Sequence, residues 1–344
     1  MDIKNQFPIF NKNKNFLYLD SASTTLKHKH CISKLNEYNE EYSANIHRSV
    51  YPIAEKATNE FEQSRKKVAK FINSNKDEVI FTKNTTEGIN LVAYSWGLSN
   101  LKKDDVILIT KMEHHSNIIP WQFVSKKTGC KLEYVPLNND GSLDMLAFEK
   151  MLTKNVKLLS IIHQSNVLGV INPVEEIIQK AKDNNTKILI DAAQSISHLK
   201  IDVKLLDCDF LVFSGHKMFG PTGVGVLYGK INILDDMEPF LFGGQMIDTV
   251  NEQESTWNNV PMKFEAGTPN IAEVIALGEC IDFISNLGFS SINNHLKELT
   301  DNYLNLLSKF NHINIYGKDL DRGPVISFNF DNIHSYDFCQ IMGQ

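Results

Sequence analysis

The segment FLVFSGHKMFGPTGVG, residues 210–225, joins a short apolar run to a lysine and then to a glycine-rich turn. Its apolar part, Phe210 to Ser214, is typical of a buried strand, and Lys217 follows soon after the strand ends. Open α/β sheets bind ligands at the carboxyl edge of their strands, so we expect Lys217 at a binding edge. The glycines that follow allow the backbone to approach a ligand closely.

A second segment, KILIDAAQ, residues 187–194, is another apolar run, and it leads into Asp191. Pyridoxal phosphate needs a lysine that forms an imine with its aldehyde and a carboxylate that pairs with its ring nitrogen. Taken alone, Lys217 has the features of a solvated surface residue and Asp191 those of a turn or cap residue. Together with the segments below, the two favour a pyridoxal-phosphate site.

Length and composition limit the class of protein. A chain of 344 residues exceeds one ordinary core, which predicts one large and one smaller domain. Its 42% hydrophobic and 22% charged residues are typical of a soluble globular protein, and a net charge of −6 gives no support for a nucleic-acid or anionic-membrane partner. With no apolar run of about 20 residues and no signal-peptide core at the N-terminus, we expect a cytoplasmic protein.

The five cysteines are dispersed and form no CxxC pair. This spacing argues against a disulfide framework and against a zinc ribbon, so we expect each cysteine to be a small buried apolar residue.

Short apolar runs alternate with amphipathic stretches, a pattern typical of a mainly parallel sheet with helices on both faces. The expected strands span residues 79–81, 106–110, 131–136, 158–163, 188–191, 210–214 and 225–228. The expected helices span residues 58–71, 86–95 and 173–184, followed by a helical region over 271–310 and strands at 313–316 and 325–330.

This order predicts a large domain over residues 16–280 and a small α+β domain made of residues 1–15 and 281–344. Because the small domain has two strands before the sequence stops at Gln344, we expect it to be incomplete at its C-terminus.

Three further segments place polar groups after expected strands. TKNTTEG, residues 82–88, offers hydroxyls and a helix N-terminus to a phosphate, although an ordinary helix cap has the same pattern. MEHHSN, residues 112–117, offers a histidine for stacking or proton transfer, and SNVLG, residues 165–169, offers an amide. A metal hydrolase site built on His114, His115 and Asp191 matches no standard ligand spacing, so no metal is expected.

In this order, these segments resemble the class V aminotransferase family of fold-type I pyridoxal-phosphate enzymes. Within that family they are most similar to the Suf-type cysteine desulfurases, which are related to selenocysteine lyases. The matching segments span essentially the whole chain and are residues 18–22, 45–48, 85–90, 112–121, 165–169, 191–195, 214–217 and 264–269.

The resemblance implies two catalytic residues, Lys217 and His114. Lys217 would form the imine with pyridoxal phosphate and move the substrate α-proton, and His114 would stack on the cofactor ring. Asp191 would pair with the ring nitrogen, and Gln194 would contact the phenolic oxygen. The residues implied to hold the phosphate are Thr85, Thr86, Ser214, His216 and, from a neighbouring subunit, Thr268.

Two residues are implied to serve the substrate. Asn166 would contact cofactor or substrate, and Arg48 would reach across a homodimer toward the active site. The implied reaction takes L-cysteine, or selenocysteine in the related lyases, to L-alanine and passes the sulfur to an acceptor protein for iron–sulfur assembly. Another lyase or transaminase reaction, or a non-catalytic dimeric scaffold that binds pyridoxal phosphate, would keep the same motifs.

The family's pattern differs from this chain at three places. Ser23 and Asn84 stand where Ala and Gly are usual, and neither removes a needed group. The larger difference is the nucleophilic cysteine of an Arg-x-Gly-x-x-Cys segment, which the resemblance places shortly beyond Gln344. We therefore expect no persulfide on this chain by the family route. Cys339 lies at a core-like helical spacing and is not expected to replace that nucleophile.

Overall fold

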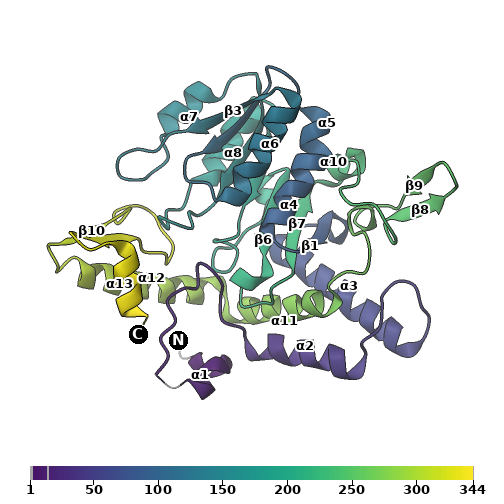
Figure 1. Cartoon of the computed structure of the whole chain (residues 1–344), viewed down its shortest axis with the longest axis horizontal. Helices are drawn as coiled ribbons and strands as arrows, with labels where there is room; N and C mark the ends of the chain where they lie inside the picture. Colours follow the sequence, from purple (N-terminus) through teal and green to yellow (C-terminus); the bar gives the residue numbers. More distant parts are fainter. Residues whose placement is uncertain (1–2, 14, 344) are drawn as a thin grey trace.

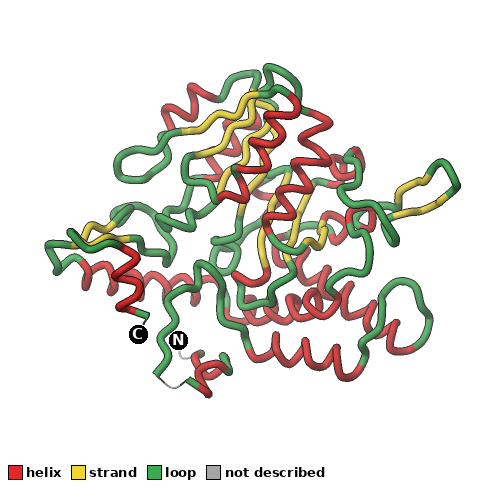
Figure 2. Tube along the Cα trace, in the orientation of Figure 1, coloured by secondary structure: helices red, strands yellow, loops and turns green. Residues whose placement is uncertain are grey.

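The computed structural model describes residues 3–13 and 15–343, and a seven-stranded sheet covered by helices lies at its centre (Figures 1 and 2). The strands of this sheet are β1 (Val79–Thr82), β2 (Val106–Thr110), β3 (Lys131–Val135), β4 (Val156–Ile162), β5 (Lys187–Asp191), β6 (Phe210–Ser214) and β7 (Gly225–Gly229). All seven expected strands are present, with ends that differ by one or two residues at most.

The strands lie in the order β1-β7-β6-β5-β4-β2-β3. Strands β3, β2, β4, β5 and β6 are parallel to one another, whereas β7 is antiparallel to both β6 and β1. The mainly parallel sheet of the expected α/β fold is therefore confirmed. Since only β7 is reversed, the carboxyl ends of the other six strands meet at one edge of the sheet.

Alternate side chains of the strands enter two separate cores, as a sheet covered on both faces requires. Ile188 and Ile190 belong to one core and Leu189 to the other. The first core includes side chains of α3 (Pro52–Ile72), α8 (Val174–Asp183) and α11 (Ile271–Leu287), and the second includes side chains of α4 (Thr85–Leu91) and α6 (Ile119–Thr128).

The remaining helices are mostly short. They are α1 (Ile9–Lys12), α2 (Lys29–Glu41), α5 (Leu98–Asn100), α7 (Met145–Met151), α9 (Val203–Leu206), α10 (Ile231–Asp236), α12 (Phe289–Leu307) and α13 (Ser335–Met342). A π-helical turn, η3 (Val92–Gly97), joins α4 to α5, and 3-10 turns are η1 (Lys4–Gln6), η2 (Lys76–Glu78), η4 (His115–Asn117), η5 (Gly215–Lys217) and η6 (Met262–Phe264).

The helical region expected over residues 271–310 is two helices in the structure. Gly288 separates α11 from α12 with φ 78° and ψ 133°, a backbone conformation that other residues rarely adopt. The helix expected at 86–95 is α4 followed by the π-helical turn, and α3 begins six residues earlier than expected, with Pro52 at its first position.

Beyond α12 lies a small α+β region (Figure 1), in which β10 (Ile313–Ile315) pairs antiparallel with β11 (Phe328–Phe330). The strand expected over 325–330 is therefore shorter than predicted. A second hairpin, β8 (Ile247–Val250) with β9 (Ser255–Trp257), projects from the body of the molecule. The domain boundary expected at residue 280 lies within α11, and that division of the chain stays a prediction. Among the described residues, no helix is long and apolar enough to cross a membrane.

Four of the five cysteines are buried as expected, and all five are free. Cys339 is exposed, so the expected core position is wrong for this residue. Helix α13 contacts the small sheet through Phe338, whose ring centroid lies 4.8 Å from that of Phe330, and no residue of the helix is buried. Its neighbour Cys339 therefore remains on the solvent side.

Candidate active site

A cavity of about 440 Å³ opens at the carboxyl edge of the sheet. Parallel strands bring their following loops together at this edge, which is why residues far apart in the sequence share one wall. Nine residues expected from the sequence line the cavity: Thr85, Thr86, His114, Asn166, Asp191, Gln194, Ser214, His216 and Lys217.

Asp191 is the last residue of β5, and its side chain is buried, with 2% of the residue exposed. Its Oδ1 accepts a hydrogen bond of 2.9 Å from the Ala193 N–H. Among the described residues, no group donates to Oδ2. Burial raises the pKa of Asp191, and the Ala193 hydrogen bond and the Lys217 charge partly oppose that rise. A cation in the cavity would stabilise this carboxylate in its charged form.

Lys217 ends the 3-10 turn that follows β6. The turn is held by the Gly215 N–H, which donates to the Val224 carbonyl at 2.9 Å. Burial lowers the pKa of Lys217, and the charge of Asp191 partly opposes that shift. A lysine with a lowered pKa presents more neutral amine, which is the form that attacks a carbonyl.

Hydroxyl groups gather where β1 leads into α4. The Thr85 N–H donates to Ser214 Oγ at 2.9 Å, and the two hydroxyl oxygens lie 2.7 Å apart. Thr86 Oγ1 lies 2.8 Å from Ser116 Oγ. Hydroxyl donors beside a helix N-terminus suit an anion such as a phosphate.

The backbone of this loop approaches β7 closely. Asn84 caps α4 by accepting a hydrogen bond of 3.0 Å from the Glu87 N–H. A Cβ atom on Gly225 would lie 2.6 Å from the Asn84 Cα, so only glycine fits here without a shift of the loop.

His114 lies in the loop after β2, with its ring on the cavity wall. Its Nδ1 accepts a hydrogen bond of 3.1 Å from the Ser116 N–H and lies 2.8 Å from the Ser116 hydroxyl oxygen. Burial lowers the pKa of His114, and the charges of Lys217 and His115 lower it further. The ring is therefore neutral at neutral pH, with its proton on Nε2.

Two other expected residues fasten the segment from Asp20 to Thr24 to the cavity. Gln194 Nε2 donates to the Ala22 carbonyl at 2.8 Å, and His216 Nδ1 lies 3.2 Å from Thr24 Oγ1. Burial, followed by the charges of Lys217 and Lys27, lowers the pKa of His216 to about 4. His216 is therefore a neutral hydrogen-bonding group.

Asn166 follows β4 in a turn held by Ser165, whose Oγ accepts a hydrogen bond of 3.0 Å from the Leu168 N–H.

Comparison with known proteins gives one family. The model of the family described as aminotransferase class-V matches residues 17–344. The chain belongs to the class-V aminotransferase family.

Relatives in this family match nearly the whole chain. A probable cysteine desulfurase of Halalkalibacterium halodurans is 46% identical over 99% of this chain and 85% of its own length, and one of Synechocystis is 45% identical over 99% and 83%. The solved cysteine desulfurase of Thermococcus onnurineus superposes with a TM-score of 0.92 at 39% identity over 99% of this chain and 85% of that one. A cysteine desulfurase structure from Escherichia coli gives 0.91 at 32% identity, over 99% and 84%.

Members of the class-V aminotransferase family depend on pyridoxal phosphate. The residues of this chain fit that cofactor, because the buried Asp191 has an oxygen without a donor, Lys217 lines the same cavity, and the hydroxyls of Thr85 and Ser214 adjoin them.

The structure does not bring Arg48 and Thr268 into this cavity. Thr268 lines a different cavity, and the Arg48 guanidinium lies against Gly244, 2.9 Å from the position that a Cβ would take. The Gly267 N–H donates to the Gly244 carbonyl at 2.8 Å. Arg48 and the segment that holds Thr268 therefore meet at Gly244.

Ser116 and Glu113 stand in the MEHHSN segment, and no role was expected for either. Ser116 lines the cavity. The buried Glu113 accepts hydrogen bonds from the Thr110 hydroxyl at 2.6 Å, the Ile162 N–H at 3.0 Å and Asn117 Nδ2 at 2.6 Å. An acid three residues after the end of an apolar strand was the available signal for Glu113.

Among the described residues, no group of three or more His, Cys, Asp or Glu side chains is arranged to hold a metal ion. His115 does not line the cavity that contains His114 and Asp191.

Proposed function

We propose that this chain is a pyridoxal-phosphate-dependent cysteine desulfurase, which converts L-cysteine and an acceptor thiol to L-alanine and a persulfide. The observation that carries the proposal is the placement of Lys217 and the buried Asp191 on one cavity wall beside the Thr85–Ser214 hydroxyl pair. Curated relatives named cysteine desulfurase, 40% to 46% identical over nearly the whole chain, support this substrate.

Pyridoxal phosphate, when bound, supplies an aldehyde that captures the substrate amine and a ring that takes up the electrons left when the α-proton departs. Lys217 would hold the cofactor through its amine. Once the substrate amine has taken that place, the Lys217 amine would remove the α-proton and return a proton to the product. Its lowered pKa favours the neutral amine that this step needs.

Asp191 would accept a hydrogen bond from the protonated ring nitrogen through Oδ2, and its charge would keep that nitrogen protonated. Thr85, Thr86, Ser214 and His216 would bind the phosphate, and Gln194 would donate to the phenolic oxygen. His114 would cover the ring and exclude water. Asn166 would contact the substrate.

We also propose a homodimer. Arg48 and Thr268 lie apart from the cavity of their own chain, which is consistent with service to the cavity of a second copy. Two large apolar side chains close in sequence to this place are exposed. Val50, two residues after Arg48, is 91% exposed, and Phe242, two residues before Gly244, is 65% exposed. Light scattering of the purified protein would measure the mass.

We also propose that a sulfur-acceptor protein is a partner of this chain and that the protein is cytoplasmic. A desulfurase needs a thiol to receive its product, and the resemblance points to an acceptor for iron–sulfur assembly. The five free cysteines suit a reducing compartment, because thiols that stay unpaired are typical there.

The near-visible absorbance of the full chain, incubated with pyridoxal phosphate and recorded before and after L-cysteine, tests the enzyme assignment. We expect a visible band that L-cysteine shifts, in the natural protein and in Lys150→Ala, a control lysine exposed on α7. Lys217→Ala should lack the band of the lysine imine. A natural protein without a band, or with a band that L-cysteine leaves unchanged, would overturn the proposal.

A further inference from the structure

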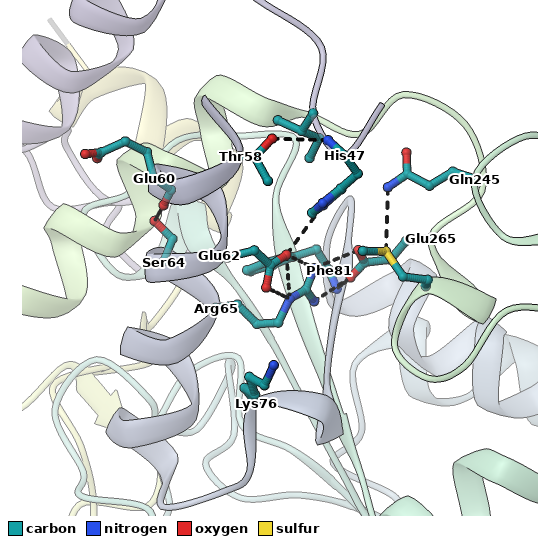
Figure 3. Close-up of polar contacts among 12 residues, drawn as sticks. His47, Thr58, Glu60, Glu62, Ser64, Arg65, Lys76, Phe81, Gln245 and Glu265 are labelled. Atoms are coloured by element: carbon teal, nitrogen blue, oxygen red, sulfur yellow. Dashed lines mark hydrogen bonds and ion pairs between the residues drawn. The ribbon is translucent and has the colours of Figure 1, made fainter. Parts of the chain in front are cut away.

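Arg65 and Glu265 form a buried ion pair outside the cavity (Figure 3). The two terminal guanidinium nitrogens of Arg65 lie 2.8 Å from the two carboxylate oxygens of Glu265, in a bidentate arrangement. Their side chains are 1% and 2% exposed. Burial acts to lower the pKa of Arg65, but Glu265 and then Glu62 hold it above its ordinary value, so the guanidinium is charged.

This ion pair is attached to β1 at two points. Arg65 Nη1 donates to the Val79 carbonyl at 2.7 Å, and the Phe81 N–H donates to Glu265 Oε1 at 2.8 Å. The guanidinium carbon also lies 4.6 Å from the centre of the Phe81 ring. Strand β1 ends at Thr82, and Lys83 and Asn84 lead from it into α4, whose first residue is Thr85, so the pair is bonded to the strand from which this turn starts.

The same arginine reaches the segment that holds Arg48. Arg65 Nε lies 3.2 Å from Glu62 Oε2, and the other oxygen of Glu62 lies 3.5 Å from His47 Nε2 (Figure 3), a contact without hydrogen-bond geometry. The backbone of His47 has φ 64°, a left-handed conformation that is costly for a residue with a side chain. Its N–H donates to Thr58 Oγ1 at 3.1 Å. The neighbouring Arg48 is therefore oriented by a strained turn fastened to α3.

Glu265 brings a third segment to the pair. It stands three residues before Thr268, and the intervening Gly267 is bound to Gly244, against which the Arg48 guanidinium lies. The contacts that lead from the ion pair through His47 and those that lead through Glu265 therefore both arrive at Gly244.

We infer that Arg65 and Glu265 are a positioning pair that holds three binding segments in one arrangement: the start of α4 with Thr85 and Thr86, the turn of Arg48 and the segment of Thr268. What these segments bind rests on the proposed function. In a homodimer, each Arg65–Glu265 pair would align Thr85 and Thr86 in the cavity of its own chain. It would also align Arg48 and Thr268, which would serve the cavity of the partner. Burying a bidentate ion pair costs desolvation free energy that a well-packed apolar pair would not cost. What the ion pair adds is a fixed geometry, set by its two parallel hydrogen bonds.

Two conservative variants test the positioning pair. Arg65→Lys keeps the charge and loses the forked hydrogen bonds, and Glu265→Gln keeps one acceptor and loses the charge. Lys67→Met is the matched control, because Lys67 also lies on α3 and its ion pairs with Glu279 and Asp282 tie α3 to α11 only. All four proteins are compared by melting temperature, pyridoxal-phosphate affinity, KM and kcat for L-cysteine, and amide hydrogen exchange without cofactor.

We expect Arg65→Lys and Glu265→Gln to weaken pyridoxal-phosphate binding about tenfold, a loss of roughly 1.4 kcal/mol. We also expect them to raise KM more than they lower kcat. In the cofactor-free proteins, exchange should quicken over residues 45–48, 82–86 and 264–268 together, and in Lys67→Met over none of these segments.

Arg65→Lys and Glu265→Gln could have lower melting temperatures and yet match Lys67→Met in amide hydrogen exchange and pyridoxal-phosphate affinity. That result would reduce the pair to a structural role and overturn the inference. If the natural protein binds no pyridoxal phosphate, the proposed function fails, while the exchange comparison still decides the positioning pair.

Discussion

Thr85 and Ser214 are joined by two hydrogen bonds although 129 residues separate them in the sequence. The contact arises from the strand order, because β1 and β6 lie on either side of β7 and both end at the carboxyl edge of the sheet. Gly225, the first residue of β7, pairs with Ser214 on one side and with Thr82 on the other. Because Gly225 has no side chain, the loop after β1 and the end of β6 meet above it.

This contact predicts a loss of phosphate affinity when either hydroxyl is removed. We expect Thr85→Val or Ser214→Ala to weaken pyridoxal-phosphate binding roughly tenfold to a hundredfold, since a hydrogen bond to a charged group contributes about 1.5–3 kcal/mol. Titration of the cofactor-free protein with pyridoxal phosphate measures the affinity. Thr186→Val is the control, because the buried Thr186 hydroxyl donates to the Val156 carbonyl at 2.8 Å, away from the cavity. Equal losses in all three variants would refute a specific phosphate contact.

Asp191 raises the pKa of Lys217 in opposition to burial, which lowers it. Asp191→Asn removes the opposing charge, so the pKa of Lys217 should fall further and its amine should become reactive at lower pH. Competitive acetylation of the cofactor-free protein across a pH series, followed by mass spectrometry of the Lys217 peptide, measures that midpoint. Lys150 in the same digest should show the same profile in both proteins. A Lys217 midpoint that stays in place or moves to higher pH would contradict the coupling.

Glu113 predicts a pH dependence of stability. Burial raises its pKa to about 8, against three hydrogen-bond donors that favour the charged form. A glutamate in the unfolded chain has a pKa of about 4.3, so the folded protein keeps a proton that the unfolded chain releases. This contribution to the free energy of unfolding is fully present below about pH 4.3 and is lost as pH rises through 8. Between pH 6 and pH 8.5, the melting temperature of Glu113→Gln should therefore decrease less than that of the natural protein. An equal decline in both would place the pKa of Glu113 near its ordinary value.

The strands and the meeting of Asp191 with Lys217 were predictable from local pattern, whereas Gln194 and His216 were expected in the cavity only from the family resemblance. A buried strand needs a short apolar run, and a parallel sheet brings the residues after such runs to one edge, so Asp191 and Lys217 could be expected to meet there. The contact between Thr85 and Ser214 was not predictable from pattern alone, because it depends on the strand order, in which only β7 lies between β1 and β6.

The Arg65–Glu265 pair was also out of reach of the sequence. Arg65 stands on the buried face of α3 with Phe61, Val68 and Ile72, but this spacing does not name its partner, which only the packing of α3 against β1 and the segment of Glu265 supplies. The exposed position of Cys339 likewise depends on which elements pack together.

Gly288 accounts for the largest difference between the expected and observed helices, and it carries the last prediction. With φ 78° and ψ 133° it turns the chain between α11 and α12, and a Cβ added there would meet no atom within 4 Å. Gly288→Ala should therefore cost about 1–3 kcal/mol of unfolding free energy through backbone strain alone. Gly243→Ala is the matched control, since a Cβ there also meets no atom and its backbone has no positive φ, and we expect a change below about 0.5 kcal/mol. Urea unfolding of both variants measures the difference, and equal stabilities would mean that α11 and α12 can join without a glycine conformation.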